Sequence, residues 1–213
     1  MAVPQTIKLT YFNLAGRAEI ARLAFHIGDI AFEDERISRG AFAALKPSLP
    51  FGQLPILTVD GKAFAQSSAI ARFAGARSGL YPTDPIAALQ VDEILEHAKD
   101  IFDVLVPTLR EPDKAKRLAM RQELTERKVQ PMCAALEARV ASTKAPIGDF
   151  VLGHALSLAD LELYLTRDLF TSGWFEGVPT TLCDDHAAWS EIAAAVAKHP
   201  KVQSWQQRAT AAQ

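Results

Sequence analysis

The first eighty residues alternate between strand-like and helix-like patterns of apolar side chains. Near the start the period is two, so that Ile7, Leu9 and Tyr11 share one face of a strand. The next apolar residues recur every three or four positions, which predicts a helix that stops at Gly28. Asp60–Gly61 predicts a tight hairpin. The predicted elements are strands at 7–13, 32–37, 55–59 and 62–65, and helices at 17–27 and 67–77. Their order predicts a small mixed α/β unit.

Two prolines three residues apart, Pro82 and Pro85, mark the clearest boundary in the chain. Two prolines at this spacing do not fit inside one continuous helix. Beyond them every apolar pattern is helical. The predicted helices span 86–109, 113–140, a segment that begins at 157, 189–197 and 201–209. Pro131 lies inside the second of these and predicts a kink or a break there. The fold class is therefore α/β followed by all-α.

The helix that begins at Ser157 carries two start signals. Ser157 and Asp160 have the spacing of a capping box, in which each side chain accepts a hydrogen bond from the other residue's backbone N–H. Leu156 and Leu161 occupy the positions of a hydrophobic staple. We interpret this segment as a folding signal without a catalytic role.

Composition narrows the function without identifying it. The 213 residues are 49% hydrophobic, and 23 basic against 25 acidic residues give a formal charge of -2. The chain has no surplus of basic residues, so its charge does not indicate a nucleic acid or an anionic membrane as partner. The first residues lack the apolar core of a signal peptide and no apolar run is long enough to span a bilayer, so we expect a cytoplasmic protein. Cys133 and Cys183 are expected to be reduced thiols, with a disulfide between them as the alternative.

Three features of the α/β unit are candidates for a binding site. Tyr11 ends the first strand and is soon followed by Arg17. Leu54–Pro55 places a proline at the start of a strand, where a cis bond would turn the Leu54 N–H and C=O toward a peptide-like ligand. Gln66–Ser67 opens a helix, whose N-terminus favours a carboxylate. Each feature also has an ordinary explanation. Tyr11 could be a core residue and Arg17 a solvated one. Pro55 could only mark the start of a strand, and Ser67 could only cap a helix.

Taken together, these segments resemble a known family. The most specific stretches are 9–13 with 16–19, then 49–57, then 66–72, and the capping box after Gly153. The chain resembles the cytosolic glutathione transferases, most closely the tyrosine-type sigma class, which includes the glutathione-dependent prostaglandin D synthases. The resemblance implies a thioredoxin-like, glutathione-binding domain at 1–81, an all-helical domain at 86–213, and a homodimer. Phe51 stands where some classes place an aromatic residue that enters the neighbouring subunit.

The resemblance also implies roles for individual residues. Tyr11 would donate a hydrogen bond to the sulfur of glutathione, and Arg17 would add positive charge beside it. Phe42 and Gln53 stand where related proteins carry tryptophan and lysine, which puts the affinity for glutathione in question. The implied glutathione-binding residues are Tyr11, Arg17, Phe42, Lys46, Gln53, Leu54, Pro55, Gln66, Ser67 and Asp100 of the partner subunit. The candidates for the apolar wall of a second-substrate pocket are Phe12, Leu14, Phe102 and Leu105. No metal is implied.

Several functions fit this pattern, and the leading one is conjugation of glutathione to hydrophobic electrophiles. A glutathione-dependent isomerase of the prostaglandin-synthase type is the second hypothesis. A non-catalytic, crystallin-like or ligand-carrying protein is the third, disfavoured because Tyr11, Arg17, Gln66 and Ser67 are all present. Dithiol redox chemistry is the least supported function. No cysteine precedes Cys133, so no thiol can stand at the end of the first strand.

Overall fold

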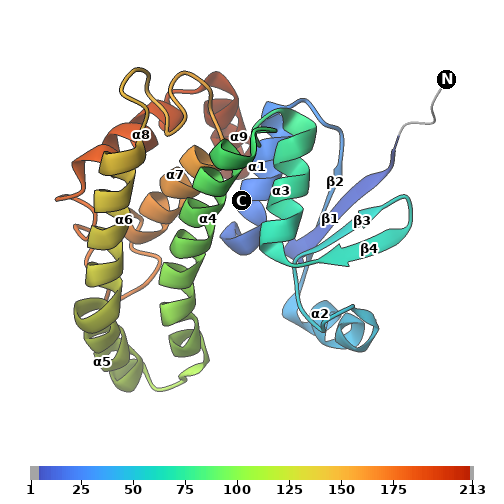
Figure 1. Ribbon diagram of the computed structural model, residues 1–213. Helices are drawn as coiled ribbons and strands as arrows, with labels where there is room; N and C mark the ends of the chain where they lie inside the picture. The colour runs from blue at the N-terminus through green and yellow to red at the C-terminus, as the bar shows by residue number, and fades with distance from the viewer. Residues whose placement is uncertain (1–4, 212–213) are drawn as a thin grey trace. The chain divides into compact units, whose positions relative to one another are not determined.

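The computed structural model describes residues 5–211, which form two compact units. The first unit contains the residues up to Pro82 together with those from Lys201 onward, and the second is Thr83–Pro200. Figure 1 shows the strands and helices of both units. The first unit holds the four-stranded sheet, and the second is built from helices, so the predicted fold class is confirmed.

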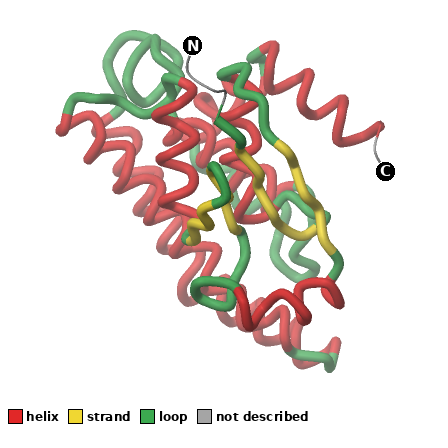
Figure 2. The backbone as a smooth tube through the Cα atoms, turned by 90° about the vertical axis from the view of Figure 1, so that its right-hand side faces the viewer, coloured by secondary structure: helices red, strands yellow, loops and turns green. Residues whose placement is uncertain are grey.

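The sheet of the first unit has the strand order β2-β1-β3-β4. Its strands are β1 (Ile7–Phe12), β2 (Glu33–Ile37), β3 (Ile56–Val59) and β4 (Lys62–Ala65), drawn in yellow in Figure 2. β1 runs parallel to β2 and antiparallel to β3, and β3 pairs with β4 in the predicted hairpin. Leu9 at the centre lies opposite Asp34 on one side and Leu57 on the other. The pairing with β3 ends at Thr10, so the end of β1, where Tyr11 stands opposite Arg36, is held by β2 alone.

Two helices of the first unit, α1 (Glu19–Ile27) and α3 (Ser67–Ser78), pack against each other. Leu23 and Phe25 of α1 are almost completely buried, as are Leu9 and Leu57 of the sheet. Each such side chain contributes about 1.5–3 kcal/mol through its removal from water. This core fixes α1 and β1 as the rigid frame of the site described below.

The sequence pattern did not predict helix α2 (Arg39–Leu45), which a short 3-10 turn at Lys46–Ser48 follows. None of its residues is buried, so it has no apolar stripe for periodicity to detect. Its start does carry a signal, since the Ser38 hydroxyl accepts a hydrogen bond from the Ala41 N–H at 3.1 Å.

The C-terminal helix α9 (Pro200–Ala211) belongs to the first unit, although it was expected within an all-helical domain at 86–213. The reason is a set of polar contacts with α1 and the residues after it. The Trp205 indole N–H donates to Glu19 at 2.6 Å, and the Ser204 hydroxyl lies 2.8 Å from a ring nitrogen of His26. Lys201 forms an ion pair with Asp29.

The second unit contains α4 (Pro85–Leu105), α5 (Lys114–Leu124), α6 (Gln130–Thr143), α7 (Leu158–Thr171) and α8 (Ala187–Ala197). A 3-10 segment, Val106–Arg110, follows α4. The predicted interruption near Pro131 is confirmed: Thr125–Val129 forms a π-helical turn between α5 and α6. Proline supplies no N–H for a regular helical hydrogen bond, and π turns are common where that pattern is interrupted.

The predicted capping box at the start of α7 is present. Asp160 is fully buried and accepts hydrogen bonds from the Ser157 N–H at 2.8 Å and the Ser157 hydroxyl at 2.7 Å. Its other oxygen accepts from the Val151 N–H at 2.7 Å, a bond that sequence reasoning did not predict. Burial raises the pKa of Asp160, and these hydrogen bonds oppose the rise. One carboxylate thus joins the start of α7 to the preceding loop.

Glu162, one turn into α7, provides a prediction on stability. Burial, together with the charge of Glu96, raises its pKa from 4.5 to about 7, although the Thr166 hydroxyl donates to it. The folded pKa lies above the unfolded one, so ionisation destabilises the fold increasingly as pH rises between these two values. Glu162→Gln should raise the unfolding free energy by about 1–3 kcal/mol at about pH 8 and by much less at about pH 4.5. Urea unfolding at both pH values measures this.

Glu123→Gln is the matched control, because the Glu123 side chain is 65% exposed. It should change the unfolding free energy by less than about 0.5 kcal/mol at either pH. An equal change in the unfolding free energy at the two pH values would contradict the raised pKa of Glu162.

Both cysteines are free and buried, as expected for reduced thiols. Burial raises the pKa of the Cys133 thiol to about 12 and that of Cys183 to about 11. Neither thiol is an effective nucleophile at neutral pH. Among residues 5–211, no helix is both long and apolar enough to cross a membrane.

Candidate active site

Tyr11 lies near the end of β1 and is 8% exposed. Its phenol oxygen accepts a hydrogen bond from the Arg17 N–H at 3.3 Å. Burial raises the pKa of Tyr11 above 10.0, while the hydrogen bond from Arg17 and the charges of Arg17 and Arg22 oppose that rise. The phenol is therefore protonated at neutral pH, and its O–H is a hydrogen-bond donor.

Gly16 makes room for the phenol oxygen. Its φ is +48°, a conformation that side chains disfavour. A Cβ added at this position would lie 2.9 Å from the Tyr11 oxygen and 2.7 Å from a methyl carbon of Leu14. Glycine is therefore required at this position both for the turn and for the place of the phenol.

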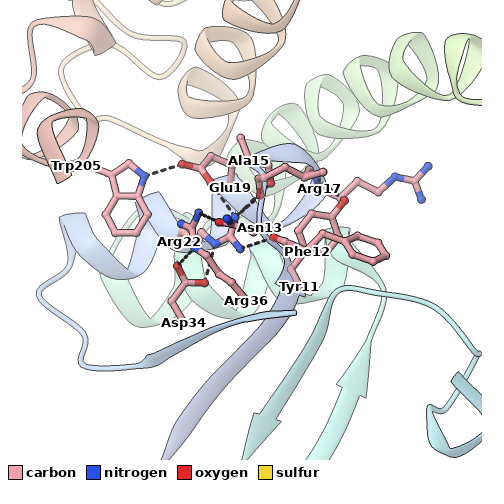
Figure 3. A network of polar contacts seen from close by, with 11 residues as sticks. Tyr11, Phe12, Asn13, Ala15, Arg17, Glu19, Arg22, Asp34, Arg36 and Trp205 are labelled. Carbon is pink, nitrogen blue, oxygen red and sulfur yellow. Dashed lines mark hydrogen bonds and ion pairs between the residues drawn. The ribbon is translucent and has the colours of Figure 1, made fainter. Parts of the chain in front are cut away.

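Arg22 is the site residue that sequence reasoning missed. It lies on α1 and has no exposed surface, yet its guanidinium carbon is 5.8 Å from the centre of the Tyr11 ring. Figure 3 shows it at the centre of a polar network, while the Arg17 side chain extends away from it. A charged residue in a helix is ordinarily solvated. The signal available in the sequence was that Arg22 is the only charged residue in the otherwise apolar stretch 20–25.

The second candidate feature stands just before β3. The Leu54–Pro55 peptide bond is cis, and Pro55 is buried. Leu54 is half-buried and Gln53 is exposed. Lys46 lies beside this segment, because a Cβ on Gly52 would be 3.6 Å from the Lys46 side chain. Lys46 and Gln53, both among the implied glutathione-binding residues, are thus near one another.

The third candidate feature is the start of α3. Gln66 precedes the helix with a φ of +78°, and no side chain caps the helix by a hydrogen bond. A strained conformation of this kind costs about 1–3 kcal/mol, and such residues cluster at functional sites. By contrast, Asp84 and Asp113 cap α4 and α5. The uncapped N–H groups of α3, with Ser67 as its first residue, favour a carboxylate.

The remaining predicted residues divide between the two units. Phe12 and Phe42 are in contact in the first unit, with ring centres 5.3 Å apart, and Leu14 is 37% exposed. Asp100 is exposed on α4 of the second unit. Phe102 is half-buried and its ring centre lies 6.0 Å from that of Phe175. Leu105 has no exposed surface, so Phe102 is the better placed of the two for contact with a ligand.

No group of three or more histidine, cysteine, aspartate or glutamate side chains in the described part of the chain could hold a metal ion.

Comparison with known proteins agrees with this geometry. Residues 7–75 match the family model of the glutathione S-transferase N-terminal domain, and residues 99–209 match that of the C-terminal domain. Glutathione S-transferase 1 of Ascaris suum is 35% identical over 204 residues, which cover 93% of this chain and 94% of the relative. Hematopoietic prostaglandin D synthase of Gallus gallus is 41% identical over 120 residues, 56% of this chain and 60% of that protein.

Solved structures agree as well. A glutathione S-transferase from the hookworm Necator americanus, described as monomeric, has a TM-score of 0.81 and 29% sequence identity. The match covers 95% of this chain and 97% of that one. The two family models together span both structural units and include β1, α1 and α3 with the residues described above. This chain therefore belongs to the glutathione S-transferase family.

Proposed function

We propose that this protein conjugates reduced glutathione to hydrophobic electrophiles and that Tyr11 stabilises the glutathione thiolate. The observation that carries the proposal is the Tyr11 phenol, which is protonated and has its oxygen fixed by the Arg17 N–H. A free thiol has a pKa near about 8.5, so little of it is ionised at neutral pH. A phenol O–H aimed at the sulfur favours the charged form and lowers that pKa.

The reaction then needs little from the protein beyond binding and orientation. The thiol proton leaves to solvent as the thiolate forms beside Tyr11. The sulfur lone pair attacks the electrophilic carbon and forms a C–S bond. In a substitution the leaving group departs with its bonding electrons, and in an addition the resulting carbanion takes up a proton. Arg17 supplies positive charge near the sulfur in this proposal.

The other parts of glutathione would bind to further residues of the first unit. Main-chain groups of Leu54, before the buried Pro55, would pair with the cysteinyl backbone. The uncapped start of α3, with Gln66 and Ser67, would hold the γ-glutamyl carboxylate. Phe42, Lys46 and Gln53 would face the glycine carboxylate. Phe12 and Leu14 of the first unit and Phe102 and Leu105 of the second are the residues that we propose for contact with the electrophile.

The finer assignments also belong to this proposal. We place the chain near the sigma class, in the cytoplasm and as a homodimer in which Asp100 of the partner subunit contacts the γ-glutamyl amine. The hookworm relative described as monomeric makes the oligomeric state a question for measurement. A monomeric mass in solution would remove both the dimer and the role of Asp100.

The direct test is retention on immobilised glutathione, followed by assays with a panel of electrophiles in the presence and absence of glutathione. Conjugate formation at a rate above the uncatalysed reaction supports the proposal. Retention without any conjugation would favour a ligand-carrying role. The match to a prostaglandin D synthase also favours an isomerase as a second candidate. Product analysis with a prostaglandin endoperoxide separates it, because isomerisation regenerates glutathione whereas conjugation consumes it.

Gly16→Ala tests whether the place of the Tyr11 oxygen matters. The added methyl group would lie 2.9 Å from that oxygen, so the phenol must move away from its present position. We expect conjugation near neutral pH to fall by about 10-fold or more, since small misplacements of a catalytic donor cost at least this much. Steady-state kinetics against glutathione and one electrophile measure the effect.

Gly61→Ala is the matched control for Gly16→Ala. Gly61 has a φ of +80°, and a Cβ there would meet no atom within 4 Å. It carries the same kind of backbone strain without touching Tyr11. If both variants lose activity equally, strain explains the loss and the steric argument at Gly16 is wrong.

A further inference from the structure

Arg22 joins the two sides of the turn in which the Tyr11 oxygen is held. Its guanidinium donates to the carbonyl oxygens of Leu14 at 2.7 Å, Ala15 at 3.3 Å and Phe12 at 3.4 Å. These residues connect β1, which carries Tyr11, to the turn that carries the Arg17 N–H. One planar group therefore fixes the backbone between the phenol and its hydrogen-bond donor.

The buried charge of Arg22 is balanced on two sides. Glu19 on α1 accepts from it at 3.1 Å, and Asp34 on β2 accepts from it at 2.9 Å. The second oxygen of Asp34 accepts from Arg36 at 2.9 Å. Arg36 in turn donates to the Asn13 side chain at 3.2 Å, which returns the network to the same turn. Two guanidinium groups thus face two carboxylates, and the buried arginine has an ion pair with each of them.

Glu19 also connects this network to the end of the chain. One of its oxygens accepts from Arg22, and the other accepts from the Trp205 indole N–H of α9 at 2.6 Å. Figure 3 shows these contacts from Trp205 to Glu19 and from Glu19 to Arg22, which lies beside Tyr11. The orientation of Glu19 is therefore set from both sides.

We propose that Arg22, oriented by Glu19, is a positioning residue that holds the turn between Tyr11 and Arg17 in the geometry needed to stabilise the glutathione thiolate. This inference rests on the proposed function. Arg22 has no exposed surface, so it acts through Tyr11 and does not contact glutathione itself. A lysine at position 22 keeps the charge but cannot reach three carbonyls and two carboxylates with one ammonium group.

The test measures the pKa of the glutathione thiol bound to each variant, from the pH profile of kcat/KM and from thiolate absorbance. Arg22→Lys should raise that pKa by about one unit and lower kcat/KM at about pH 6.5 by about 10-fold. In a Tyr11→Phe background the same substitution should change kcat/KM by less than about twofold, because Arg22 acts through the phenol. A structural role alone would add the same loss in both backgrounds.

Arg121→Lys is the matched control. Arg121 is 5% exposed in the second unit, where it donates to the Thr108 hydroxyl and the Glu176 carbonyl. Arg121→Lys should lower the free energy of unfolding by about as much as Arg22→Lys does, while the pKa of the bound thiol stays at the wild-type value. An unchanged thiol pKa in Arg22→Lys would overturn the inference.

If Arg22→Lys does not fold, Glu19→Gln decides the question, because the amide oxygen can still accept from Trp205 while the amide nitrogen cannot accept from Arg22. It should raise the thiol pKa in the same direction by a smaller amount, and a wild-type value would overturn the inference. Failure of the proposed function would give a different result, because the wild-type protein itself would then not ionise bound glutathione.

Discussion

Tyr11→Phe should lower kcat/KM for conjugation by about 100-fold at about pH 6.5 and leave the KM for glutathione within about threefold. The substitution removes the one phenol O–H that is fixed by the Arg17 N–H, and it preserves the buried ring and its contact with Phe12. A loss of this size corresponds to a rise of about two units in the pKa of the bound thiol.

The pH dependence gives the sharper test. Wild-type activity should rise with pH through the lowered thiol pKa and then level off. In Tyr11→Phe the same rise should occur at higher pH, so that the two enzymes differ most below neutrality and converge in alkali. Tyr164→Phe, a half-buried tyrosine on α7 of the second unit, is the control and should keep the wild-type profile. Equal turnover by Tyr11→Phe and wild type would remove the role given to Tyr11.

Asp160→Ala should lower the free energy of unfolding by about 4 kcal/mol, a large share of the about 5–15 kcal/mol that stabilises a typical domain. The substitution leaves the N–H groups of Val151 and Ser157 without their acceptor, and each buried unsatisfied group costs about 1–3 kcal/mol. It also leaves the Ser157 hydroxyl without its partner. Urea unfolding at neutral pH, followed by circular dichroism, measures the change.

Asp113→Ala is the control for this prediction. Asp113 also caps a helix, by accepting from the Lys116 N–H at 2.8 Å, but it is exposed to water. Its loss should cost about 1 kcal/mol. If Asp160→Ala lowers the free energy of unfolding no more than Asp113→Ala does, burial of the capping carboxylate does not increase its contribution to stability. If Asp160→Ala does not accumulate in soluble form, Ser157→Ala gives the measurable comparison and should fall between the two.

The periodic parts of the sequence predicted most of the fold. The four strands, the hairpin at Asp60–Gly61, the interruption near Pro131 and the capping box at Ser157 all follow from local chemistry. Helix α2 was missed because none of its residues is buried. The contacts of α9 with α1 were not predicted, because they join residues far apart in sequence and local periodicity carries no information on such contacts.

The candidate site was predicted less completely than the fold. Tyr11, Leu54–Pro55 and Gln66–Ser67 stand at recognisable places: the end of a strand, a proline before a strand and the start of a helix. Their roles in binding remain predictions. Arg22 was missed because a charged residue on a helix is normally exposed, whereas here two carboxylates and three carbonyls replace water. The positive φ of Gln66 was also unpredicted, because nothing about glutamine favours that conformation.

The return of α9 to the first unit has a consequence for how the chain matures. The sheet and its helices are synthesised first, but the indole that binds Glu19 arrives only after all of Thr83–Pro200 has left the ribosome. Until then Glu19 and His26 lack their partners on α9, and the α/β unit is discontinuous. Completion of the network around Tyr11 is thus coupled to synthesis of the chain as far as α9, and a chain truncated before α9 would lack the Trp205 contact to Glu19.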